Sequence, residues 1–70
     1  MKVSARNVFK GKVKKIHDGM VSSEVVIELP GGQEIVSVVT RGAVANLGLA
    51  VGKDAYAVIK ASSVMLGVDH

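Results

Sequence analysis

The chain has 70 residues, a net charge of +3 and no cysteine. These features limit it to a single domain and exclude disulfides and thiolate metal sites. A domain this small buries only about 60% of the surface of its unfolded chain. Because 49% of the residues are hydrophobic, we expect a homo-oligomer in which part of the apolar surface faces another subunit.

The first half of the sequence alternates between apolar and polar residues, which predicts β-strands. Residues 7–16 follow this pattern with lysines on the polar side. Gly11 in the middle of that strand indicates a close backbone approach or a bulge. Residues 23–30 and 33–40 flank a Pro-Gly-Gly turn and predict a hairpin. Residues 33–40 are apolar on both faces, which indicates a central strand or one at a subunit interface.

The second half changes to a helical pattern before returning to strands. Residues 41–47 are predicted to form a short helix, with Thr40 as its N-cap and Gly48 just beyond its C-terminus. Two further strands are expected over residues 54–61 and 63–66. Many short strands with glycine-rich turns predict an all-β fold, a small OB-like antiparallel barrel with one short helix.

The sequence gives no support for a catalytic centre. His17 and His70 are the only histidines, and neither stands in a nucleophile or metal-binding motif. Glu24 and Glu28 lack a supporting group for acid–base chemistry, and phosphate-binding glycine loops are absent. We therefore expect that the protein is not an enzyme and offers no direct ligands to a metal ion.

The N-terminal residues contain no apolar run of signal-peptide length. No segment approaches the roughly 20 apolar residues of a membrane span. We therefore expect a cytoplasmic protein with no membrane partner.

Every charged residue before Asp18 is basic, and such a stripe can attract anions or nucleic acid. An OB-like module that binds single-stranded nucleic acid is therefore an alternative function. Such modules stack bases on aromatic side chains, and this chain has one Phe, one Tyr and no Trp. A solvated strand face whose lysines block edge pairing is the preferred interpretation of Lys10, Lys12 and Lys14, and the shortage of aromatic residues argues against nucleic acid as a partner.

Two clusters place a cation beside hydroxyl residues and away from acids, which is the combination that binds small oxyanions. Arginine and lysine supply positive charge, and hydroxyl and backbone N–H groups supply donors. Ser4 lies two residues from Arg6, and Lys60 lies two residues from Ser62. Each pair therefore projects to the same side of an extended segment. Thr40 and the first amides of its helix form a third group of donors.

The same stretches resemble the molbindin (Mop) family, which is the molybdate-binding version of the TOBE domain. The resemblance covers about residues 3–66 and depends on "SARN", "TRGAVANLGLAVG" and "KASSV", in this order. It implies one OB-like domain over residues 1–70 that binds molybdate or tungstate for storage and buffering in the cytoplasm. It also implies a homohexamer, a trimer of dimers with anions held between subunits and a strand exchanged within dimers.

Matched residue by residue, the resemblance implies that Ser4 and Arg6 bind the oxyanion from one subunit, while Asn7 fixes the local backbone. Lys60, Ala61 through its backbone N–H, and Ser62 are expected to bind it from a neighbouring subunit. Two positions follow less directly from the family pattern: Thr40 matches a position near the oxyanion, and Ala43 stands where some relatives carry Ser.

A secondary oxyanion site is expected at the threefold axis of the hexamer, formed by Val21, Ser22 and Ser23. No organic cofactor is expected. The remaining alternative is a carrier of a molybdenum–pterin cofactor, and the shortage of aromatic residues for stacking argues against it.

Overall fold

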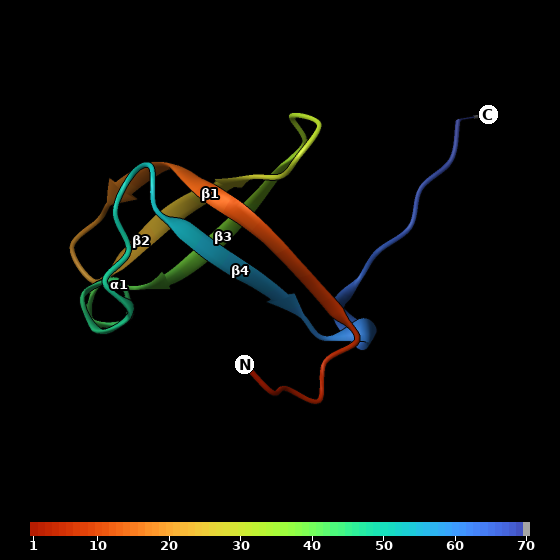
Figure 1. Ribbon diagram of the computed structural model, residues 1–70, viewed down its shortest axis with the longest axis horizontal. Helices are drawn as coiled ribbons and strands as arrows, with labels where there is room; N and C mark the ends of the chain where they lie inside the picture. Colours follow the sequence, from red (N-terminus) through yellow and green to blue (C-terminus); the bar gives the residue numbers. More distant parts are fainter. Residues whose placement is uncertain (70) are drawn as a thin grey trace.

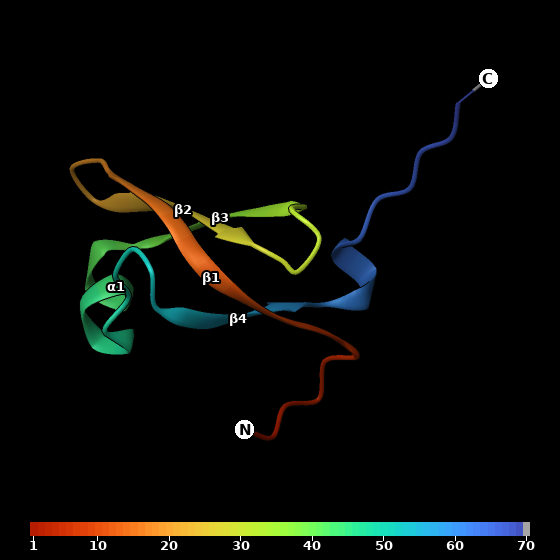
Figure 2. The ribbon, with the colours of Figure 1, turned by 45° about the horizontal axis from the view of Figure 1, so that its top comes forward.

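The computed structural model describes residues 1–69, so His70 lies outside the described part of the chain. Four strands form one antiparallel sheet in the order β3-β2-β1-β4. The sheet curls into a half-barrel, with β4 lying opposite β2 and β3 (Figures 1 and 2). The elements are β1 (Asn7–Asp18), β2 (Ser22–Glu28), β3 (Glu34–Thr40), α1 (Arg41–Leu47), β4 (Asp54–Ile59) and the 3-10 helix η1 (Ala61–Ser63).

Strand β1 joins the two sides of the half-barrel because it changes partner along its length. Its first half, from Asn7 to Lys12, pairs with β4, and its second half, from Lys12 to Asp18, pairs with β2. The register with β2 shifts between Val13 and Lys15, as a β-bulge shifts it. The extra residue returns Ile16 to the core side, where it packs beside the buried residues.

Gly11 lies close to this change of partner and allows β1 to pass close to β2. A Cβ atom at this position would lie 2.6 Å from the carbonyl oxygen of Glu28 and 2.6 Å from Cγ2 of Ile27. The predicted close backbone approach at Gly11 is therefore confirmed.

The core lies inside the curl of the sheet. Apolar side chains that alternate along β1, β2 and β4 point into it, as the period of two predicts. Residues from α1 and the loop that follows it pack against this cluster and close one end of the half-barrel. The buried members of the cluster are Val13, Val25, Ile27 and Ala57.

The predicted helix is confirmed over Arg41–Leu47. The Thr40 hydroxyl accepts a hydrogen bond from the Ala43 N–H at 3.0 Å, as an N-cap does. Gly48 ends the helix with φ of 64°, a conformation that glycine adopts without strain.

The predicted last strand over residues 63–66 is wrong, and β4 ends at Ile59 instead of continuing to residue 61. Residues Ala61–Ser63 form η1, in which the Ser63 N–H donates to the Lys60 carbonyl at 2.8 Å. The residues that follow lead away from the body of the molecule (Figures 1 and 2). An extended segment becomes a strand only beside a partner edge, and within residues 1–69 this segment has none.

Candidate functional site

Five of the six residues predicted as primary oxyanion ligands line one hollow of the surface. One wall comes from the segment before β1, and the other comes from the end of β4 and from η1. The hollow therefore lies at the end of the molecule where β1 begins (Figure 1). Its lining residues are Ser4, Ala5, Arg6, Val58, Lys60, Ala61 and Ser62.

The antiparallel pairing of β1 with β4 explains why the two walls meet. Asn7 and Ile59 form the last pair of this ladder, so Arg6 and Lys60 follow directly beyond it on either side. The Asn7 side chain adds a bond at this point, because its Nδ2 donates to the Ile59 carbonyl oxygen at 3.2 Å. A single chain thus brings together the two cations that the resemblance assigned to different subunits.

The η1 wall offers donors more readily than acceptors. The carbonyl oxygen of Lys60 accepts from the Ser63 N–H at 2.8 Å, and that of Ala61 accepts from the Val64 N–H at 3.2 Å. The first backbone N–H groups of a helix have no acceptor within the helix. In η1 these are the N–H groups of Ala61 and Ser62, which therefore remain available to a ligand. The hydroxyl groups of Ser4 and Ser62 are exposed and add two rotatable donors.

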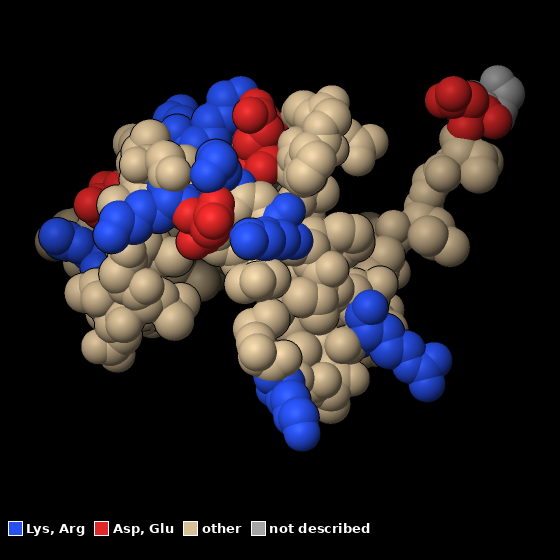
Figure 3. All heavy atoms as spheres, viewed as in Figure 1, with Lys and Arg blue, Asp and Glu red and all other residues tan. Residues whose placement is uncertain are grey.

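The hollow is positively charged and contains no acid. Its lining includes Arg6 and Lys60 but neither Asp nor Glu. Within residues 1–69 neither cation has a carboxylate within ion-pair distance. In the view of Figure 3, the basic side chains at this end of the molecule likewise have no acidic neighbours.

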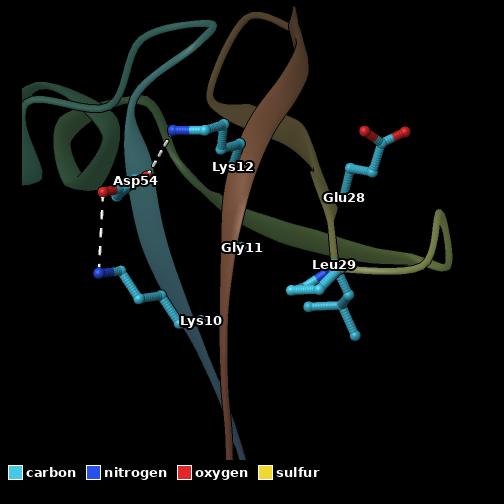
Figure 4. A pocket seen from close by; sticks show the side chains of 7 residues that line it. Lys10, Gly11, Lys12, Glu28, Leu29 and Asp54 are labelled. Atoms are coloured by element: carbon cyan, nitrogen blue, oxygen red, sulfur yellow. Dashed lines mark hydrogen bonds and ion pairs between the residues drawn. The ribbon is translucent and has the colours of Figure 1, made fainter.

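Three of the four lysines of β1, namely Lys10, Lys12 and Lys14, differ from the cations of the hollow because acids pair with them. Lys12 Nζ lies 2.9 Å from Asp54 Oδ1, and Lys10 Nζ lies 3.9 Å from Asp54 Oδ2 (Figure 4). The hydrogen bond and charge of Lys12, followed by the charge of Lys10, lower the pKa of Asp54.

Lys14 is similarly engaged, with Nζ 2.5 Å from Glu34 and 3.4 Å from Glu28. The hydrogen bond and charge of Glu34 raise the pKa of Lys14, and those of Glu28 add to the effect. Figure 3 shows the resulting mixture of acidic and basic side chains over the strands. Lys10, Lys12 and Lys14 thus form a solvated, charge-paired face, as the alternation of β1 predicts.

Thr40 does not line the hollow. It stands at the junction of β3 and α1, where its hydroxyl already accepts the bond from Ala43. Ala43 has no hydroxyl group to add at that helix end. Within one chain, therefore, Thr40 lies apart from the five other predicted ligands that line the hollow.

The three residues of the predicted secondary site differ in how they face solvent. Val21 is exposed, and its carbonyl oxygen accepts from the Arg41 N–H at 3.0 Å. Ser22 is also exposed. Ser23 is only 1% exposed, and its hydroxyl donates to Asp18 Oδ1. The donor of Ser23 is therefore already used inside the protein, and the surface of this turn is formed by Val21 and Ser22.

Two lining residues were not predicted from the sequence. Ala5 lies between Ser4 and Arg6, and Val58 precedes Lys60 by two positions on β4. The period of two would have identified Val58, because residues two apart on a strand share a face. Both residues give the hollow apolar surface between its charged and hydroxyl groups.

The remaining features bear on metal ions and membranes. Residues 1–69 contain no group of three or more His, Cys, Asp or Glu side chains arranged to hold a metal ion. Neither helix of the described chain has the length and apolar character needed to cross a membrane.

Comparison with known proteins gives consistent matches over nearly the whole chain. The TOBE domain profile matches residues 3–66. A probable molybdenum-pterin-binding protein of Haemophilus influenzae is 54% identical over 69 residues, which is 99% of this chain and 100% of that protein. MopII from Clostridium pasteurianum, in an apo form, superposes with a TM-score of 0.90 at 40% identity, covering 96% of this chain and 100% of MopII.

A second solved structure is ModG, described as a cytoplasmic molybdate-binding protein and crystallised with molybdate bound. It superposes with a TM-score of 0.94 at 55% identity over 99% of this chain. The match covers 49% of the ModG chain, so this chain spans about half of it.

Proposed function

This chain belongs to the TOBE domain family, and from that premise we propose that it binds molybdate or tungstate reversibly. The binding site is the hollow between the start of β1 and η1. The observation that carries the proposal is that Ser4, Arg6, Lys60, Ala61 and Ser62 line one acid-free hollow. The molybdate bound to ModG and the names of the molybdenum-pterin-binding relatives support the choice of oxyanion.

The chemistry of the hollow suits a tetrahedral dianion that carries no proton. Arg6 and Lys60 neutralise its two charges, and hydroxyl and amide groups donate to its oxygens through charge-assisted hydrogen bonds. Phosphate keeps at least one proton at neutral pH and therefore needs an acceptor. A hollow rich in donors disfavours phosphate because few of its groups can accept that proton. No bond is made or broken in this binding, so the protein does not act as an enzyme. Its role is to store and buffer the anion in the cytoplasm.

We also propose that the chain forms a homohexamer, a trimer of dimers. Support comes from apolar side chains that remain exposed in the single chain, such as Val36 and Val38 on β3 and Leu66 in the tail. Exposed apolar patches that exceed those of ordinary monomers mark protein–protein interaction sites. In such an assembly, Thr40 and the exposed secondary-site residues Val21 and Ser22 contribute only where a second chain approaches them, whereas Ser23 stays bonded to Asp18 inside the protein.

Titration calorimetry with molybdate, tungstate, sulfate and phosphate tests the proposed function. We expect heat with molybdate and tungstate, weaker binding of sulfate and none of phosphate. Absence of binding for both molybdate and tungstate would contradict the proposal.

The names of the relatives favour one second candidate, a carrier of a molybdenum–pterin cofactor. A pterin ring needs a stacking surface, and the hollow has no aromatic residue. Phe9 and Tyr56 line other hollows. Mass spectrometry of the protein purified under native conditions separates the candidates, because the pterin carrier retains an organic mass and the oxyanion protein retains molybdate alone.

A further inference from the structure

Asn7 occupies the point where the two walls of the hollow meet. Residues 1–6 form neither helix nor strand, so β1 begins at Asn7 and the Ser4–Arg6 wall has no ladder of its own. The bond from Asn7 Nδ2 to the Ile59 carbonyl joins residues 52 positions apart. Among the side-chain hydrogen bonds of residues 1–69, it alone ties the start of β1 to the end of β4.

The strand pairing itself does not depend on this side chain. The ladder between β1 and β4 continues from Val8 and Val58 to Lys12 and Asp54 through backbone groups. Loss of the Asn7 amide therefore leaves the sheet paired as far as Asn7 and Ile59, but it removes the side-chain bond that reinforces this last pair before Arg6. The half-buried position of Asn7 shields that bond from water, which makes it a more effective anchor than an exposed one.

We propose that Asn7 is a positioning residue that sets the separation of the Arg6 and Lys60 side chains, and that this separation lets the hollow distinguish molybdate from the smaller sulfate. The inference rests on the proposed function. Sulfate and molybdate have the same charge and shape, so positive charge alone attracts both. Donors held at a fixed separation that fits the larger anion cannot all reach the oxygens of the smaller one.

A released Ser4–Arg6 wall removes this restriction. The wall can then move inward and close around sulfate, while molybdate loses the benefit of preorganised donors. The Asn7 bond thus raises the affinity for molybdate and lowers the relative affinity for sulfate. A residue that only stabilised the fold would change both affinities by the same factor, because both anions bind the same folded fraction.

The test compares Asn7→Leu with Asn46→Leu, which makes the same substitution at an exposed position of α1. Asn7→Ala provides a second variant in case Leu packs differently at the start of β1. Titration calorimetry gives the dissociation constants for molybdate and sulfate, and circular dichroism checks that each variant is folded. The decisive quantity is the ratio of the sulfate constant to the molybdate constant.

We expect both Asn7 variants to bind molybdate roughly threefold to tenfold more weakly, the range that one hydrogen bond supports. The ratio is expected to fall by at least about threefold, whereas Asn46→Leu leaves it unchanged. A ratio that stays at the wild-type value in both Asn7 variants overturns the role of Asn7. Wild-type protein that binds the two anions equally also overturns it but leaves oxyanion binding intact. Wild-type protein that binds neither of these anions, and does not bind tungstate either, overturns the proposed function itself.

Discussion

Replacement of Gly11 by alanine tests the crossing of β1 over β2. The new methyl group would meet the carbonyl oxygen of Glu28 and Cγ2 of Ile27, each at 2.6 Å, and the carbonyl carbon of Glu28 at 3.2 Å. The Glu28 atoms belong to the backbone and cannot rotate away. The Ile27 side chain is 5% exposed and has little space to move into. The substitution therefore requires the two strands to separate.

The cost of this separation follows from two opposing effects. Inserting a methyl group into a packed site costs about 1–3 kcal/mol, and a clash with backbone lies toward the upper end of that range. The smaller entropy of the unfolded alanine chain recovers about 0.4–1 kcal/mol. We expect a net loss of about 2 kcal/mol, which for a small domain lowers the Tm by roughly 10 °C.

Thermal unfolding followed by circular dichroism measures this loss. Gly67→Ala is the matched control, because a Cβ atom there has no neighbour within 4 Å and its φ is not positive. We expect the Tm of the control to stay at the wild-type value. A Gly11→Ala protein as stable as wild type would refute the reasoning, because β2 would then have room for the methyl group.

Four further substitutions, with two control variants, separate binding from stability. Arg6→Ala and Lys60→Ala are each expected to weaken molybdate binding by roughly 2 kcal/mol in calorimetry. Lys53→Ala is the control, because Lys53 lies outside the hollow, and it is expected to leave the affinity unchanged. Equal losses of affinity in all three variants would remove Arg6 and Lys60 from the site. Thr40→Ala is expected to lower the free energy of unfolding by about 1 kcal/mol, because the N-cap hydrogen bond is lost. Thr40→Ser keeps the capping hydroxyl and is expected to keep the wild-type free energy of unfolding. Urea denaturation measures both variants. The lowered pKa of Asp54 gives stability that is present above its unfolded value of about 3.9 and is lost as the pH falls through the lower folded value. Asp54→Asn is therefore expected to flatten the acid side of the stability profile, and an unchanged profile would count against these ion pairs.

The elements that were predicted from the sequence depend on local chemistry. The bounds of α1 follow from Thr40 at one end and Gly48 at the other, and both capping interactions involve residues within a few positions. The alternation of β1 likewise predicts its faces as far as Val13. The bulge that follows Val13 arises from the pairing with β2, and a tertiary pairing leaves no local pattern to detect. This is why the sequence does not predict that Ile16 faces the core.

The last strand was predicted wrongly for a related reason. Residues 63–66 contain the apolar side chains of a strand, but a strand also needs an edge to pair with. The sequence cannot show whether such an edge lies within reach. The two residue pairs that line the hollow could be identified from the sequence because the spacing of Ser4 with Arg6 and of Lys60 with Ser62 is local. Their role in binding stays a prediction. Only the meeting of the two pairs depended on the ladder that ends at Asn7 and Ile59.

That meeting changes what assembly is expected to contribute to binding. One chain already places Arg6 and Lys60 around one hollow, so a second chain is not needed to supply both cations. The hollow is open to water, however, and water screens its charges. A neighbouring subunit that covered it would exclude water and strengthen each charge-assisted bond. We therefore expect dissociated chains to bind molybdate weakly and with strong dependence on salt, and assembled chains to bind it tightly. Calorimetry at concentrations above and below the dissociation of the assembly, checked by native mass spectrometry, measures this difference. Equal affinity in the two states would show that the hollow of a single chain is already the complete site.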